Sequence, residues 1–144
     1  MSAEFNVGQT KSMQDFEELA LSLCARPGMY CIDPSLAAVC AYLRGFDAAR
    51  DGGPLLGFQQ WLIVRRRADH NLVWEGLVLW EAFPETRSLP TPRALDDDAL
   101  GIKVFASLLA AFFKERRERS VAAIFDDHTR WLRRQKWYTG PLRR

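Results

Sequence analysis

The segment from residue 95 to residue 113 carries a long and wide apolar stripe. Its helical-period positions hold Leu100, Val104, Leu108 and Phe112, and Ile102, Phe105, Leu109 and Phe113 broaden the stripe. A helix with so wide an apolar face has to be covered by other elements, because apolar surface is unfavourable in water. The run Asp96-Asp97-Asp98 adds negative charge at the positive end of the helix dipole. We therefore expect a long helix at the centre of a helical domain.

Two shorter helices are expected before it. Ser12 fits the N-cap of the first, which ends at Arg26-Pro27-Gly28 because proline disfavours helical geometry in the residue that precedes it. Asp33-Pro34 fits the start of the second, since proline suits the first helical position. Its buried face is expected to hold Leu36, Val39, Cys40, Leu43 and Phe46. Asp51-Gly52-Gly53-Pro54 then ends this helix.

Three further segments complete the helical pattern. A third helix is expected from near Leu55 to Arg65-Arg66-Arg67, with Phe58, Trp61 and Leu62 inward. Residues 71–83 are apolar nearly all round, which fits a buried helix or a buried strand; we favour the helix, with Gly76 as its weak point. A last helix should run to about Lys136, and its apolar face holds Val121, Ile124, Phe125, Trp131 and Leu132.

These segments predict an all-α or mainly α fold, built as a single compact domain of five to six helices. The domain should cover residues 11–141, between a flexible arm at 1–10 and a basic tail at 142–144. A chain of 144 residues, 48% of them hydrophobic, suits one domain with one core. The sequence shows no internal repeat that would suggest another architecture.

The cysteines and the N-terminus bear on the cellular compartment. Cys24, Cys31 and Cys40 form an odd set without a CxxC motif, which fits small buried hydrophobes in a reducing cytosol. A reactive thiol is the alternative. The start of the chain lacks the pattern of a secretory signal, and no run of about 18 apolar residues occurs. We therefore expect a cytoplasmic protein that does not enter a membrane.

Charge is unevenly distributed along the chain. Residues 114–144 hold ten basic and four acidic side chains, a net charge of +6, whereas the whole chain is at +2. The basic residues Arg130, Arg133, Arg134, Lys136, Arg143 and Arg144 are interleaved with Trp131, Trp137 and Tyr138. Such a group could neutralise phosphates and stack on bases, so a regulatory protein that binds nucleic acid is the alternative function. Against it, Trp131 is expected in the core and the net charge of the chain is small.

Motifs for catalysis are missing from the sequence. It contains no G-x-S-x-G, no Cys-His frame and no phosphate-binding glycine loop. Asp126-Asp127-His128 is the only local acid–base group, but adjacent helical residues diverge by about 100°, so spacing alone does not pair Asp126 with His128. An acid–base enzyme would need these side chains to line a pocket. We expect no catalytic site, no metal site, no cofactor and no small-molecule ligand.

Several residues together resemble a known group of proteins. They are Arg26-Pro27-Gly28-Met29-Tyr30, Leu36 and Leu43-Arg44-Gly45-Phe46-Asp47-Ala48-Ala49 in the second helix, Phe58 with Trp61-Leu62, Trp74, and Trp131-Leu132 with Gln135, Trp137-Tyr138 and Gly140-Pro141. The pattern spans residues 16–141. It resembles the small immunity proteins encoded beside polymorphic toxins of bacterial competition systems, such as those delivered by type VI secretion.

The resemblance implies a protein that binds one cognate toxin tightly and blocks its active site or its substrate path. Most residues that carry it are expected in the scaffold: Gly28 in a turn, Gly45 at a close helix contact, and Trp61, Trp74, Trp131 and Trp137 in the core. For the toxin-binding surface we favour loops and acidic helix ends, namely Glu75, Glu81, Glu85, Asp96, Asp97 and Asp98. If the toxin acts on nucleotides or nucleic acid, these carboxylates could take the place of phosphate groups.

Overall fold

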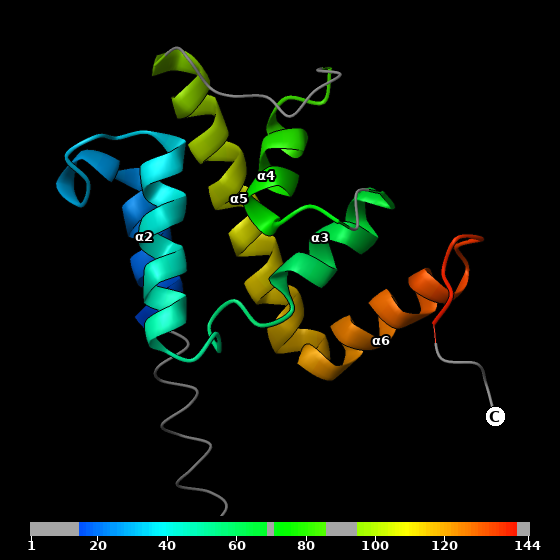
Figure 1. Cartoon of the computed structure of the whole chain (residues 1–144). Helices are drawn as coiled ribbons and strands as arrows, with labels where there is room; N and C mark the ends of the chain where they lie inside the picture. Colours follow the sequence, from blue (N-terminus) through cyan, green and yellow to red (C-terminus); the bar gives the residue numbers. More distant parts are fainter. Residues whose placement is uncertain (1–14, 69–70, 86–94, 141–144) are drawn as a thin grey trace, which may run out of the picture.

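A computed structural model describes residues 15–68, 71–85 and 95–140 of the chain (Figure 1). Every regular element within these ranges is a helix: an N-terminal helix described over 15–25, the short 3-10 helix η1 (Pro27–Met29), α2 (Leu36–Ala49), α3 (Phe58–Arg66), α4 (Trp74–Ala82), α5 (Leu95–Arg119) and α6 (Val121–Arg133). The predicted helical fold is confirmed, and a helix occupies most of 71–83. The predicted arm, the basic tail and the Ser12 cap lie outside the described residues.

The long helix α5 is the central element, as the sequence predicts. It contacts α2, α4 and α6, and α3 in turn contacts α4 and α6. Figure 1 shows the N-terminal helix and α2 on one side of α5, α3 and α4 on the other, and α6 projecting from the C-terminal end of α5. None of the described helices is long and apolar enough to cross a bilayer.

Aromatic rings form the middle of the core. The ring of Phe58 on α3 is fully buried, and its centroid lies 5.1 Å from that of Phe112 and 6.3 Å from that of Phe105, both on α5. The same centroid lies 5.6 Å from that of Trp74 on α4, and Trp74 stacks on Phe105 at 5.4 Å. Aromatic pairs at such distances add to the stabilisation from burial. Three helices are thereby joined at one point.

Two helix starts differ from the prediction. Ser35 caps α2, because its Oγ accepts the backbone N–H of Ala38 at 3.1 Å, so Pro34 lies before the helix and not in its first turn. The serine hydroxyl stands at the spacing that an N-cap bond requires. α3 begins at Phe58 rather than near Leu55, because Gly57 has a φ of 91°, which a residue with a side chain rarely adopts.

Some residues expected in the core or at close contacts lie at the surface. Leu100 is 46% exposed because α2 packs against the neighbouring side of α5, where a Cβ on Gly101 would stand 2.8 Å from Leu36. Gly45, by contrast, has open space at that position, so none of the described helices approaches it closely. Trp61 and Trp74 are buried as predicted.

The C-terminal end of α6 is also more exposed than predicted. The helix ends at Arg133 rather than near Lys136, and Trp131 is only half-buried. Trp137, which was expected in the core, is 49% exposed. The physical reason is that, among the described helices, α6 packs mainly against α3 and α5, and its C-terminal end extends past them.

Candidate partner-binding surfaces

The predicted acidic residues on α4 bind neighbouring helices. Glu75 forms a two-pronged ion pair with Arg44 of α2, whose guanidinium also lies 5.2 Å from the ring centre of Trp74. The hydrogen bond to Glu75 raises the pKa of Arg44. Glu81 accepts a hydrogen bond from Arg65 of α3 at 2.8 Å. These carboxylates tie α4 to α2 and to α3, so a partner could bind them only by sharing or displacing an arginine.

The acidic residues around the start of α5 are divided in their roles. The carboxylate of Asp98 accepts the backbone N–H of Leu36 at 2.9 Å, which satisfies one of the donors left open at the start of α2. Asp97 is exposed, and so is Glu85 just after α4. The side chain of Asp96 lies outside what the structure describes. Three of the predicted toxin-binding residues therefore fasten helices, and two face solvent.

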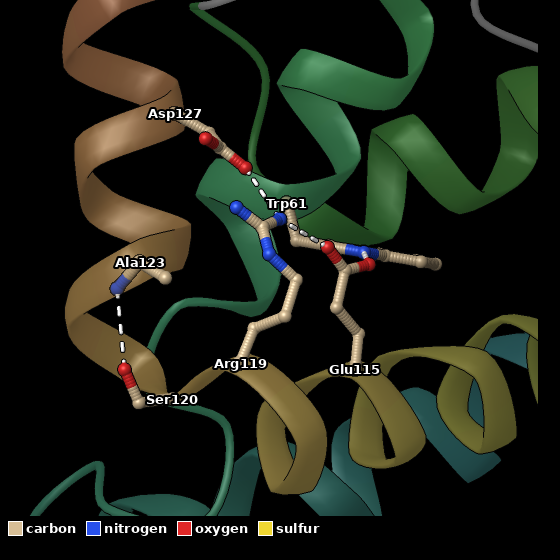
Figure 2. Close-up of polar contacts among 6 residues, drawn as sticks. All are labelled: Trp61, Glu115, Arg119, Ser120, Ala123 and Asp127. Atoms are coloured by element: carbon tan, nitrogen blue, oxygen red, sulfur yellow. Dashed lines mark hydrogen bonds and ion pairs between the residues drawn. The ribbon is translucent and has the colours of Figure 1, made fainter.

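A polar cluster joins α3, α5 and α6 (Figure 2). Glu115 accepts the indole N–H of Trp61 and binds Arg119 at 2.7 Å, and Arg119 reaches Asp127 at 2.6 Å. The hydrogen bond from Arg119 holds the pKa of Asp127 below its usual value. A cavity of about 200 Å³ beside the cluster is lined by Trp61, Val64, Arg65, Glu115, Ile124 and Asp127. Both carboxylates share Arg119, and these hydrogen bonds link three helices, so the cluster suits a structural joint.

Of the three acid–base residues singled out in the sequence, all on α6, Asp127 lines this cavity and is bound by Arg119. Asp126 is exposed, and the ring of His128 stacks on Trp131 with 6.4 Å between the centroids. Neither Asp126 nor His128 lines the cavity beside the polar cluster. Over the ranges that the structure describes, no group of three or more His, Cys, Asp or Glu residues is placed to hold a metal ion.

The loop between the N-terminal helix and α2 exposes several large apolar side chains. Ile32 is fully exposed, Met29 is 72% exposed and Tyr30 is 39% exposed. The ring of Tyr30 packs edge-on against Tyr42 of α2, with 6.1 Å between the centroids. We refer to Met29, Tyr30, Ile32 and Tyr42 as the η1 patch. Exposed apolar side chains that gather in this way mark sites of interaction.

Backbone hydrogen bonds hold the η1 patch in place. The amide of Met29 donates to Arg26 O at 3.0 Å, and the amides of Tyr30 and Cys31 donate to Pro27 O at 3.1 and 2.9 Å. Next to the loop lies an apolar hollow of about 520 Å³, lined by Leu21, Cys24, Ala25, Pro27, Pro34, Ala99, Ile102, Lys103 and Ala106. Sequence reasoning missed this surface. The sequence feature that could have indicated it is the apolar run from Met29 to Ile32, which is too short for a helix and is bounded by turn residues.

Cysteine labelling checks the packing beside the hollow. Burial raises the pKa of the Cys24 thiol to about 12, and burial raises the pKa of the Cys40 thiol as well. Thiols react as thiolates, so iodoacetamide at about pH 8 should modify only the half-buried Cys31 in the native protein and all three cysteines in denaturing urea. Intact mass spectrometry counts the adducts. Modification of Cys24 or Cys40 under native conditions would contradict the described packing of the N-terminal helix on α2.

The chain was compared with protein families, curated proteins and solved structures. No protein-family model, no curated protein and no solved structure matches the chain.

Proposed function

We propose that this protein is an immunity protein, which binds a cognate secreted bacterial toxin and inhibits it by covering its active site or its substrate path. The observation that carries the proposal is the η1 patch, where Ile32 and Met29 expose apolar side chains on a loop with a fixed backbone. Covering these side chains with a partner removes apolar surface from water and so favours binding.

The η1 patch has the composition of an interface centre. Methionine and tyrosine are enriched in protein interfaces, and charged residues are depleted at their centres. The adjoining hollow, which includes Pro27 and Pro34, offers an apolar side chain of the partner a place to insert. A loop that is already ordered loses little conformational freedom on binding. These features favour tight recognition of one protein.

The η1 patch also coincides with part of the resemblance to immunity proteins. The motif Arg26-Pro27-Gly28-Met29-Tyr30 forms the exposed loop around η1, although most of the resemblance was expected in the scaffold. Glu75, Glu81 and Asp98 bind groups of this chain, so they are poorly suited to anchor a toxin. We therefore propose the η1 patch as the centre of the contact, with Glu85 and Asp97 as exposed acidic residues that a basic toxin could meet.

Co-expression tests the proposal directly. The tagged protein is expressed with the product of the reading frame next to its gene, and the complex is purified at high salt. A one-to-one complex with a neighbour that is lethal when expressed alone is the expected result. A harmless neighbour that forms no complex would contradict the antidote function.

A single substitution tests the η1 patch within that complex. Ile32→Asp should weaken binding by about 30-fold, because it puts a charge at the centre of the contact in place of an apolar anchor. Leu56→Asp is the matched control, since Leu56 is 47% exposed and follows the opposite end of α2. Calorimetric titration gives both affinities, and circular dichroism confirms that both variants are folded. Equal affinities for the two variants would refute the η1 patch as the contact.

A further inference from the structure

We propose that a second surface, at the end of α6 and in the turn that follows it, binds single-stranded nucleic acid without sequence preference. We name this surface the α6 ridge and define it by Trp131, Trp137 and Tyr138 together with Arg130, Arg133, Arg134 and Lys136. The η1 patch shares none of these residues. The proposal goes beyond the antidote function and does not rest on it.

Aromatic rings follow one another along the α6 ridge. The rings of Trp131 and Trp137 meet edge-to-face with 6.1 Å between their centroids, and those of Trp137 and Tyr138 meet with 6.4 Å. The interplanar angles are 62° and 84°, so the ring faces point in different directions. Trp137 is 49% exposed, whereas Trp131 is half-buried, because it packs partly against the core and the ring of His128 stacks on it. The exposed ring of Trp137 is a platform on which a single-stranded base can stack.

Basic side chains without carboxylate partners flank these rings. Arg130, Arg133, Arg134 and Lys136 are exposed, and none forms an ion pair within the part of the chain that the structure describes. Arg65, Arg117 and Arg119, by contrast, each bind a carboxylate. These four charges are thus available to a polyanion and would release its counterions on binding.

The acidic side chains of α6 offset only part of the positive charge of the α6 ridge. Of the two carboxylates on the helix, Asp127 is bound by Arg119 at 2.6 Å, which leaves Asp126 as the exposed one. Arg119 also binds Glu115, and its hydrogen bond, helped by the charge of Arg130, lowers the pKa of Asp127, so the four basic groups face Asp126 and part of the charge of Asp127. Four of the ten basic residues in 114–144 belong to the α6 ridge, whereas Lys114, Arg116, Arg117 and Arg119 lie on α5.

The combination of rings and charges favours a single strand over other polyanions. An acidic protein surface would pair with the basic side chains, but it does not supply a planar base for the exposed ring of Trp137 to stack on. A nucleic-acid duplex keeps its base faces stacked inside, so only its phosphates could bind the α6 ridge, through the basic side chains. A single strand supplies both phosphates and free base faces.

Fluorescence anisotropy with labelled thymidine and uridine oligonucleotides, about twelve nucleotides long, tests the proposal. Binding should occur with a Kd on the order of 10 µM at about 50 mM salt. The affinity should fall about 50-fold by about 200 mM salt, because four phosphate contacts give a logarithmic slope of about −3. Quenching of tryptophan fluorescence should accompany binding, since Trp137 stacks on a base.

Variants separate the two parts of the α6 ridge. Trp137→Ala should weaken binding about tenfold, while Trp137→Phe, which keeps a ring, should retain most of the affinity. Arg133→Ala with Arg134→Ala should reduce the salt slope by about half. The control is Arg26→Ala with Lys103→Ala, which removes the same charge from exposed positions beside η1 and on α5. This control should bind as the unaltered protein does.

Three results would overturn the proposal. One is equal binding by Trp137→Ala and the unaltered protein. Another is equally tight binding of a duplex of the same length, which would mean that charge attraction alone accounts for the binding. The third is equally tight binding of poly-glutamate, which would point to an acidic polypeptide instead. None of these measurements involves a toxin, so failure here leaves the antidote proposal standing, and the reverse also holds.

Discussion

Replacing Phe58 by alanine should remove about 4 kcal/mol from the free energy of unfolding, the largest loss expected from one substitution in this protein. The ring is fully buried, and its centroid lies within 6.3 Å of those of Trp61, Trp74, Phe105 and Phe112. Those neighbours are bulky rings on three helices, so they cannot collapse into the space that alanine leaves. Domains are stable by only about 5–15 kcal/mol, and the variant should therefore unfold at a much lower urea concentration.

Two further variants make this test specific to the shape of the core. Phe58→Leu keeps most of the apolar volume and should cost less than about 1.5 kcal/mol. Leu56→Ala, at an exposed position two residues earlier, should change the free energy by no more than about 0.5 kcal/mol. Urea unfolding followed by circular dichroism measures all three. A loss below about 1.5 kcal/mol for Phe58→Ala would contradict the packing of α3 against α4 and α5.

Apolar periodicity explains why the fold could be predicted from the sequence. The stripe that contains Phe105, Leu109 and Phe112 is buried on α5, and α5 is the helix that the others surround. Periodicity shows how many apolar positions share one face of a helix, and that number determines how much of its surface other elements must bury. It does not report where neighbouring helices end. Leu100 shares the stripe and is nevertheless exposed, because coverage depends on where α2 and α4 cross α5.

The candidate sites could be predicted less well, because a carboxylate in a sequence does not reveal its partner. Glu75 and Arg44 are 31 residues apart, yet they form the ion pair that joins α2 to α4. Only the packing of the two helices brings them together. The η1 patch was overlooked for a related reason, since an apolar run gives the same signal whether a neighbour covers it or not. Ile32 has no such cover in the described part of the chain.

Arg116→Met should cause the second large loss of stability, because Arg116 of α5 holds the turn between α2 and α3. The guanidinium of Arg116 donates to the carbonyl oxygens of Pro54 at 2.8 Å, Gly53 at 3.0 Å and Leu56 at 3.3 Å. Burial lowers its pKa, and the nearby charge of Asp47 partly offsets that effect. Methionine keeps the apolar stem but removes the hydrogen bonds to three carbonyls, of which Gly53 O keeps the amide of Leu56 at 3.2 Å, so the free energy of unfolding should fall by about 3 kcal/mol.

The neighbouring residue supplies a matched control for Arg116. Arg117 is also an arginine on the last turn of α5, but its partner is the carboxylate of Glu17 and its side chain is 57% exposed. Exposed ion pairs contribute little, so Arg117→Met should cost less than about 1 kcal/mol. Hydrogen exchange adds a local measurement, because the amide of Phe58, which donates to Leu55 O at 3.0 Å, should lose protection in Arg116→Met alone. Equal losses in the two variants would mean that Arg116 acts through its charge and not by holding the turn.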